Sequence, residues 1–204
     1  MTEQPAADDL YSFRFRGGRP CLNLVATVGW RSALKPVERL RSTGDLADWL
    51  IAAHLVAVRP NVLPDELASA RRLREAVYRL VVATMKHQLP KSNDIALINR
   101  WSRIPQPVPT LKFGNGLLHL QEETPQPTRA ALSVIARDAI LLLGSKSIRV
   151  KECARPDCTL LFVDTSRSGR RRWCSMDACG NRAKTVGYRK RLKGRERPME
   201  ISEQ

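Results

Sequence analysis

The sequence has none of the short motifs that most often mark a catalytic site. It contains no nucleophile elbow, no phosphate-binding loop and no paired carboxylates in a catalytic arrangement. Its three histidines, His54, His87 and His119, lie in separate segments and share no motif. Each is therefore expected to be a surface or packing residue, not a ligand. No residues can be named for an enzyme, and we expect a protein without catalytic activity.

Long apolar runs are also missing. No segment is apolar over the roughly 18 residues that a membrane span needs. The first residues include Glu3, Asp8 and Asp9, where a signal peptide would have a basic start. We therefore expect a cytoplasmic protein with no membrane partner. In that reducing compartment, clustered cysteines are expected to be metal ligands and not disulfides.

Cysteine is scarce, but four of the five cysteines fall in one short segment. Cys153, Cys158, Cys174 and Cys179 form two Cys-x4-Cys pairs that are separated by fifteen residues. Each pair can present two sulfurs from a tight turn, and this spacing predicts one bound zinc ion. Four thiolates leave no open coordination position, so the zinc is expected to be structural. The fifth cysteine, Cys21, lies in an apolar run and is expected to be an inert core thiol.

Positive charge is concentrated around the four clustered cysteines. Between Lys146 and Pro198 there are 16 Lys and Arg against 5 Asp and Glu, a net of +11 out of +15 for the whole chain. Small basic modules of this kind most often bind nucleic acid. A solvated basic surface or an anionic lipid surface is the weaker alternative, because the cations surround a metal site and do not follow an amphipathic helix.

Length and composition divide the chain into two parts. With 204 residues and 43% hydrophobic content, it can form one domain of about 140 residues and a small module that needs a metal. We place a mostly helical domain at residues 1–146, a zinc-finger domain at 147–197 and a tail at 198–204. The expected fold is a mainly α N-terminal domain with a small β-hairpin, followed by a small treble-clef-like zinc finger of the α+β type.

Apolar spacing predicts the elements of the first domain. Helices are expected at residues 45–58, 64–85, 92–101 and 128–143. Ser92 is expected to cap the third helix and Gly144 the fourth. Gly114-Asn115-Gly116 predicts a hairpin between residues 110–113 and 117–121. Residues 11–15 alternate like a short strand, whereas residues 21–28 fit either a buried strand or the first turns of a helix.

The finger is expected to contain a hairpin between its two cysteine pairs. Residues 159–163 and 170–173 are predicted to be its strands, and residues 180–193 a helix. In so small a module, Phe162 and Trp173 are expected to be core residues.

The nucleic-acid contacts are expected from cations of the hairpin turn and the last helix. The candidates are Arg167, Arg170, Arg171, Arg172, Arg182, Lys184, Arg189, Lys190 and Arg191. Of these, Arg170, Arg172, Arg189 and Arg191 are favoured for direct contact. About six phosphate contacts would give a slope near −5 for log K against log salt. Asn181 suits adenine recognition, but capping of the helix or support of the sulfurs is favoured for it.

Two stretches of this sequence resemble known families. The run from Phe162 to Met176, followed by Cys179-Gly180-Asn181-Arg182-Ala183-Lys184, resembles the CGNR zinc finger, which is named for residues 179–182. In that family the finger usually follows a domain called ABATE, described for stress-induced transcription regulators of bacteria. Residues 17–27 resemble the early ABATE signature, with Asn23 where the family more often has Asp and Ala26 where it has Asn.

The resemblance and the charge together favour a DNA-binding transcription regulator. In it, the finger binds DNA while the helical domain senses a small effector or forms a homodimer. A module that grips RNA or other nucleic acid without reading sequence is the alternative, and a thiol-redox sensor is a third reading. Removal of the metal is expected to unfold the chain from about residue 150 onward and to leave the earlier domain largely intact.

Overall fold

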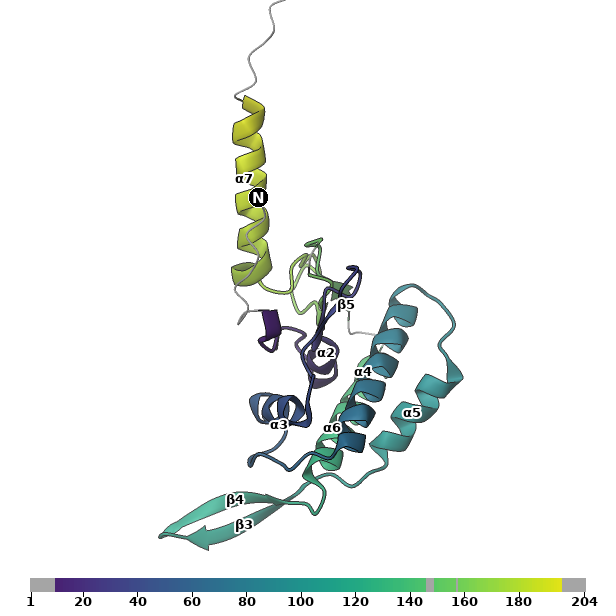
Figure 1. Ribbon diagram of the computed structural model, residues 1–204, viewed down its shortest axis with the longest axis vertical. Coiled ribbons are helices and arrows are strands. Elements are labelled where there is room, and N and C mark those ends of the chain that lie inside the picture. Colours follow the sequence, from purple (N-terminus) through teal and green to yellow (C-terminus); the bar gives the residue numbers. More distant parts are fainter. Residues whose placement is uncertain (1–9, 146–148, 157, 196–204) are drawn as a thin grey trace, which may run out of the picture.

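The computed structural model describes residues 10–145, 149–156 and 158–195. The described chain is rich in helices and also contains three two-stranded antiparallel sheets. Two long helices, α4 (Pro64–Met85) and α6 (Pro127–Gly144), form the body, and α3 (Thr43–Ala52) and α5 (Ser92–Ser102) pack against them (Figure 1). The helix-rich fold with small hairpins is the one that the sequence predicts.

The short helix α2 (Pro20–Val25) lies between α4 and α6. This settles the open choice for residues 21–28 in favour of a helix. Pro20 at its first position is favourable because its fixed φ suits a helix and no amide is lost. The backbone N–H of Cys21 donates to Asp138 Oδ2 of α6 at 2.9 Å, and Arg19 lies 2.6 Å from the other oxygen. One carboxylate thus satisfies a free amide at the start of α2 and fixes the helix on α6.

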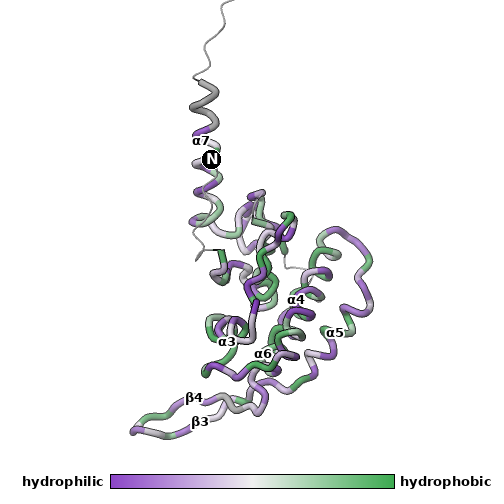
Figure 2. The backbone as a smooth tube through the Cα atoms, viewed as in Figure 1, coloured by the Kyte–Doolittle hydropathy of each residue, from purple (hydrophilic) through white to green (hydrophobic). Residues whose placement is uncertain are grey.

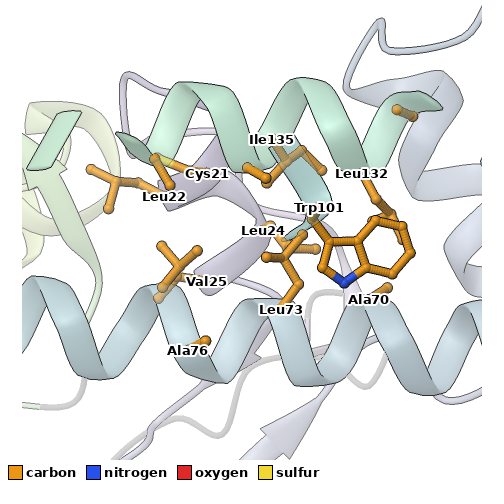
Figure 3. Close-up of a cluster of buried hydrophobic side chains, with 14 of the residues drawn as sticks. Cys21, Leu22, Leu24, Val25, Ala70, Leu73, Ala76, Trp101, Leu132 and Ile135 are labelled. Carbon is orange, nitrogen blue, oxygen red and sulfur yellow. The ribbon is translucent and has the colours of Figure 1, made fainter. Parts of the chain in front are cut away.

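The main core is built from α2, α3, α4, α5 and α6, and its centre lies where α2 meets α4 and α6. Figure 3 shows Leu22, Leu24 and Val25 of α2 beside Leu73 of α4 and Ile135 of α6. These side chains are at most 3% exposed. Cys21 is fully buried here, as predicted, and burial raises the pKa of its thiol well above the usual value.

Helix α4 has the predicted bounds, but one residue on its polar side is buried. Arg74, which lies off the apolar stripe, is only 4% exposed. Its guanidinium lies 2.7 Å from both carboxylate oxygens of Glu38 and donates to Thr27 Oγ1 at 3.1 Å. Glu38 belongs to β2 (Val37–Glu38), which pairs with β1 (Val28–Gly29). Arg74 therefore anchors this small sheet to α4.

Helix α3 is shorter than the prediction for residues 45–58. It begins at Thr43, because the side chains of Ser42 and Asp45 form a reciprocal capping box. It ends at Ala52, and His54 follows with a left-handed φ of 55°. That conformation stops a helix, so the apolar spacing beyond it belongs to a turn.

Two predicted caps are wrong. Ser92 is the first residue of α5 and Lys91 holds the cap position, without a side-chain hydrogen bond. Gly144 is the last residue of α6, and the cap position belongs to Ser145. Helix α6 is open to solvent along one side, where Leu141 is exposed.

The predicted strand near the start is absent. Residues 12–16, all within the described chain, form no strand. Instead, Phe13 packs on the core, and the ring of Phe15 stacks on Trp49 with 6.1 Å between centroids. The alternation of residues 11–15 reflects this aromatic packing.

The predicted hairpin is present and longer than expected. Its strands are β3 (Val108–Gly114) and β4 (Leu117–Glu123). Asn115 and Gly116 have φ values of 51° and 76°, which a two-residue type I′ turn requires. The hairpin projects from the helical body, and α7 lies at the other end of the molecule (Figure 1).

The finger has a different strand order from the predicted one. Strand β5 (Val150–Glu152) pairs with β6 (Leu161–Val163), so the hairpin encloses the first cysteine pair. Residues 170–173 form no strand, although Arg172 O accepts a hydrogen bond from the Ala154 N–H at 2.9 Å. A π-helical turn, η1 (Met176–Gly180), leads into α7 (Asn181–Arg195), which extends away from the body (Figure 1).

Candidate metal centre and nucleic-acid interface

The fold brings the four clustered cysteines together. Cys153 and Cys158 lie in the turn between β5 and β6, whereas Cys174 lies just before η1 and Cys179 lies within it. All four sulfur atoms are within 4.8 Å of one another. The distances from Cys174 to Cys158 and to Cys179 are 3.7 and 3.5 Å, and Cys158 to Cys179 is 3.6 Å.

These distances fit a metal site. Four sulfurs around one ion, each about 2.3 Å from it in a tetrahedron, would lie roughly 3.8 Å apart. A disulfide would need about 2.05 Å, and all four cysteines are free thiols. The four thiols therefore form a closed set of ligands that can hold one metal ion.

Neighbouring groups support the sulfurs. The backbone N–H of Cys174 donates to Cys153 Sγ at 3.5 Å, and Arg155 Nη1 lies 3.9 Å from Cys179 Sγ. The pKa of Cys153 is lowered, first because its sulfur accepts a hydrogen bond from Cys158, whose own pKa is raised in return. The Cys174 amide and the Arg155 guanidinium favour the thiolate that a metal ligand must be.

A second, smaller core surrounds the thiols. Phe162 is fully buried in it and Trp173 packs at its edge, as the sequence predicts. Ala26, which follows helix α2, is also part of this core. The finger therefore packs against the helical region directly.

Strand β6 joins the two cores. Leu161 is buried in the main core, whereas the next residue, Phe162, is buried beside the thiols. Successive side chains of a strand point to opposite faces, so one strand serves both cores. The Val163 N–H donates to Gly17 O at 3.0 Å, and the Gly17 N–H donates to Asn23 Oδ1 at 2.9 Å. Asn23, a position where the chain departs from the ABATE signature that it resembles, thus holds the loop to which β6 is bonded.

A buried carboxylate that sequence reasoning missed shapes the segment of residues 164–172, here called the basic turn. Asp164 Oδ1 accepts from the backbone and side chain of Ser166 at 3.0 and 2.6 Å. Its Oδ2 accepts from the Arg171 N–H at 3.1 Å and lies 2.8 Å from Lys151 Nζ. The ion pair with Lys151 is the first cause that lowers the pKa of Asp164. A lone acid among arginines was the available sequence signal.

Six of the nine predicted nucleic-acid ligands are exposed on two neighbouring elements. Arg167, Arg170 and Arg172 lie on the basic turn. Arg182, Lys184 and Arg189 lie on α7. The side chains of Lys190 and Arg191 lie outside the described residues.

Arg171 is different from its neighbours, because it points inward. Its guanidinium donates to Trp173 O at 2.9 Å and to Cys174 O, and it lies 4.8 Å from the centroid of the Phe162 ring. These contacts fix the chain that leads into the second cysteine pair. Arg171 thus has contacts that support the metal centre, and its nucleic-acid contact stays a prediction.

Asn181 does not act as the predicted cap. Its backbone is helical, with φ of −65°, and its side chain is exposed. The capping hydrogen bond comes from Ser175, whose Oγ accepts from the Ala178 N–H at 3.3 Å. Ser175 thus starts the turn that carries Cys179.

Comparison with known families agrees with this architecture. Residues 18–146 match the model of ABATE, described as "Putative stress-induced transcription regulator", and this match spans more than half of the 204 residues. The chain belongs to the ABATE family. Residues 149–192 match the CGNR zinc finger, which contains all four clustered cysteines. No curated protein matches the chain.

The other side chains that the structure describes form no second site of this kind. Among the described residues, the four cysteines are the only cluster of potential metal ligands, and the three histidines lie apart from it. No described helix has both the length and the apolar character needed to cross a bilayer.

Proposed function

We propose that this protein is a DNA-binding transcription regulator whose finger holds one structural zinc ion and presents a basic surface to DNA. The observation that carries the proposal is the placement of six exposed cations on the basic turn and α7, two elements that adjoin the same four-thiol cluster. A cluster with four thiolate ligands has no open position for catalysis, so a non-enzymatic role fits it.

The zinc assignment follows from the donor set. Four thiolates at tetrahedral spacing select zinc or an iron–sulfur cluster among common metals, and a single ion fits sulfurs 3.5–3.7 Å apart. The ion would hold Cys153 and Cys158 against Cys174 and Cys179. This fixes the direction in which the basic turn and α7 leave the finger.

Helix α7 is suited to lie along nucleic acid. Its 15 residues span about 22 Å, and an α-helix fits the major groove of DNA. Val186 and Tyr188 are exposed along with its cations, so no side of the described helix is committed to a core. A helix of this length is only marginally stable in water, and contact with DNA would stabilise it.

Redox sensing has less support. All four thiols are at most 5% exposed, which restricts the access of an oxidant. For the helical domain we propose a role in assembly of two copies of the chain.

The first test is a selection of random-sequence duplex DNA by the zinc-loaded full chain at near-physiological salt, with RNA as competitor. A consensus that binds at least about a thousandfold more tightly than random DNA is expected. Uniform, salt-sensitive binding without a consensus, or preference for RNA, would replace this function by a general nucleic-acid module.

The second test locates the surface. Reversal of charge at Arg170, Arg172, Arg189 and Arg191 together should weaken DNA binding by at least about a hundredfold and lower the salt slope by about 4. The matched control reverses four exposed cations of the helical domain, Arg72, Lys86, Arg100 and Arg103. Unchanged affinity in the finger variant, or an equal loss in the control, would refute the assigned surface.

A further inference from the structure

The β3–β4 hairpin exposes an apolar face. Leu111 lies directly opposite Leu120, and Phe113 lies directly opposite Leu118. Residues two apart on a strand share a face, so these four side chains lie together on one side of the ribbon. They are 64–75% exposed. Figure 2 shows the projecting hairpin with several hydrophobic positions along it.

The opposite face of the same hairpin is mainly polar. It carries Thr110 opposite Gln121 and Lys112 opposite His119. Thr110 Oγ1 donates to Gln121 O at 2.9 Å, and His119 Nε2 lies 2.8 Å from Gly114 O. Exposed apolar residues at the ends of this face are Val108 and Leu117. The hairpin is therefore amphipathic, although nothing in the described chain covers its apolar face.

A two-stranded ribbon is marginal by itself in water and needs a further layer for stability. Here the two strands pack chiefly against each other, away from the helices (Figure 1). Four large apolar side chains gathered on one projecting face are also typical of an interaction surface. Among the described residues, no element supplies a further layer for the ribbon.

We propose that this layer is the same hairpin of a second copy of the chain, so that two apolar faces pack together about a two-fold axis. A two-fold contact uses the same patch on both copies, which suits a flat face made of two apolar pairs. Each of the four apolar side chains exposes about 100 Å² of surface that a partner can bury, or roughly 400 Å² per copy. Two copies thus approach the roughly 1,000 Å² of a small specific interface, and a micromolar dimer is expected.

Charge favours a second copy at this place. The chain carries a net +15, but residues 108–123 contain one Lys and two Glu. The electrostatic repulsion between two copies is therefore smallest when they meet through their hairpins. Lys112 lies on the other face, so packing of the four apolar side chains does not bury its charge. A lipid surface would attract the exposed cations of α7, but these lie at the other end of the molecule from the hairpin (Figure 1).

This inference deepens the proposed function, on which its biological meaning rests. Two fingers related by a two-fold axis would match a palindromic DNA site. The self-association itself needs no DNA, so it can be tested separately.

The test is sedimentation of the zinc-loaded full chain from about 1 to 200 µM, a range chosen around the micromolar affinity expected for so small an interface. The mass should rise from the 23.0 kDa of one chain towards twice that value. Leu120→Lys should raise the dimer Kd at least about a hundredfold, because two like charges would face each other in an apolar contact. Gln121→Lys is the matched control, since it adds the same charge at the next residue on the polar face. Its Kd should change less than about threefold. Far-UV circular dichroism and zinc content verify the fold of both variants.

Three results would overturn the proposal. They are a wild-type chain that stays monomeric throughout the range, a dimer that survives Leu120→Lys, and equal weakening by the two variants. Vesicles of anionic lipid test the competing occupant: a monomeric chain that binds them through Leu120 would assign the face to lipid. A dimer without a DNA consensus would leave this inference standing and remove the proposed function, and a monomer with a consensus would do the reverse.

Discussion

The helical region and the finger are stabilised in different ways. In the helical region, Leu22, Leu73 and Ile135 come from three helices and are fully buried with no need of a metal. The finger has one fully buried large side chain, Phe162, beside its four thiols, and it adds the buried carboxylate of Asp164. A small module exposes too much of its surface to be stable by apolar burial alone, so it depends on cross-links.

The difference in stabilisation does not make the two regions independent. Leu161 and Phe162 are neighbours on β6 and belong to different cores. Ala26, next to helix α2, packs with the thiols. The structure thus indicates two sources of stability that share one strand.

The largest effect is expected from loss of the metal. Chelation, or Cys158→Ala, should remove binding free energy on the order of 10 kcal/mol and unfold the finger. The helical region should keep most of its circular dichroism but melt at a lower temperature, because Leu161 leaves its core. Hydrogen exchange with and without chelator measures both parts. Cys21→Ala, outside the cluster, should leave metal content unchanged. Protected finger amides without metal would contradict the assignment.

The next effect separates the two cores on one strand. Leu161→Ala should destabilise the helical region by about 2–5 kcal/mol, and Phe162→Ala should destabilise the finger by about 3–5 kcal/mol. Metal affinity, measured by competition with a chelator, should fall much more for Phe162→Ala. Denaturant unfolding of the metal-loaded chains should show the reverse, with only Leu161→Ala lowering the stability of the helical region. The same profile for both variants would mean that the two cores unfold as one.

A smaller effect separates two adjacent arginines of the finger. Arg171→Ala should weaken metal binding by about 10–100-fold, because its guanidinium holds Trp173 O and Cys174 O beside the cluster. Arg172→Ala should leave the metal unaffected and lower the salt slope of DNA binding by about 1. Chelator competition and salt titration of each variant provide the two readouts. Exchange of these two outcomes would reverse our assignment of the side chains.

The sequence predicts most of the helical region because its signals are local. The Asn115-Gly116 turn and the apolar stripe of α4 each depend on residues close in sequence, and both are confirmed. The end of α3 was predicted wrongly, because the apolar spacing of the sequence continues beyond the left-handed His54 that ends the helix. The burial of Arg74 was not predicted, because its partner, Glu38, is far away along the chain.

The candidate site shows the same limit. The four cysteines are recognisable from spacing, and the structure brings them together. The strand order of the finger is not recognisable from the sequence, because β6 pairs with β5 and not with residues 170–173. The roles of Asp164 and Arg171 also depend on contacts across the finger, to Lys151 and Cys174. Composition identifies a basic surface but does not say which cation points inward.

The smallest expected effect tests whether ion pairs matter to the helical region. Asp94 accepts two hydrogen bonds from Arg79, at 2.6 and 2.8 Å, and these are the first cause that lowers its pKa. Because the folded pKa lies below the unfolded value of about 3.9, the pair stabilises the fold above that pH and loses its effect as the pH falls through the folded pKa. Arg79 is 44% exposed and screened by solvent, so Asp94→Asn should cost about 1 kcal/mol or less at pH 7.

Thermal unfolding between pH 7 and pH 3 checks this last prediction, with the difference between wild type and Asp94→Asn shrinking as the pH falls below about 4. Asp48→Asn is the control, since its pair with Arg59 is equally short at 2.6 Å but exposed on both sides. It should have no measurable effect at any pH, because solvent screens an exposed pair. A loss for Asp94→Asn as large as that for Leu161→Ala would mean that the helical region, like the finger, depends on a polar cross-link.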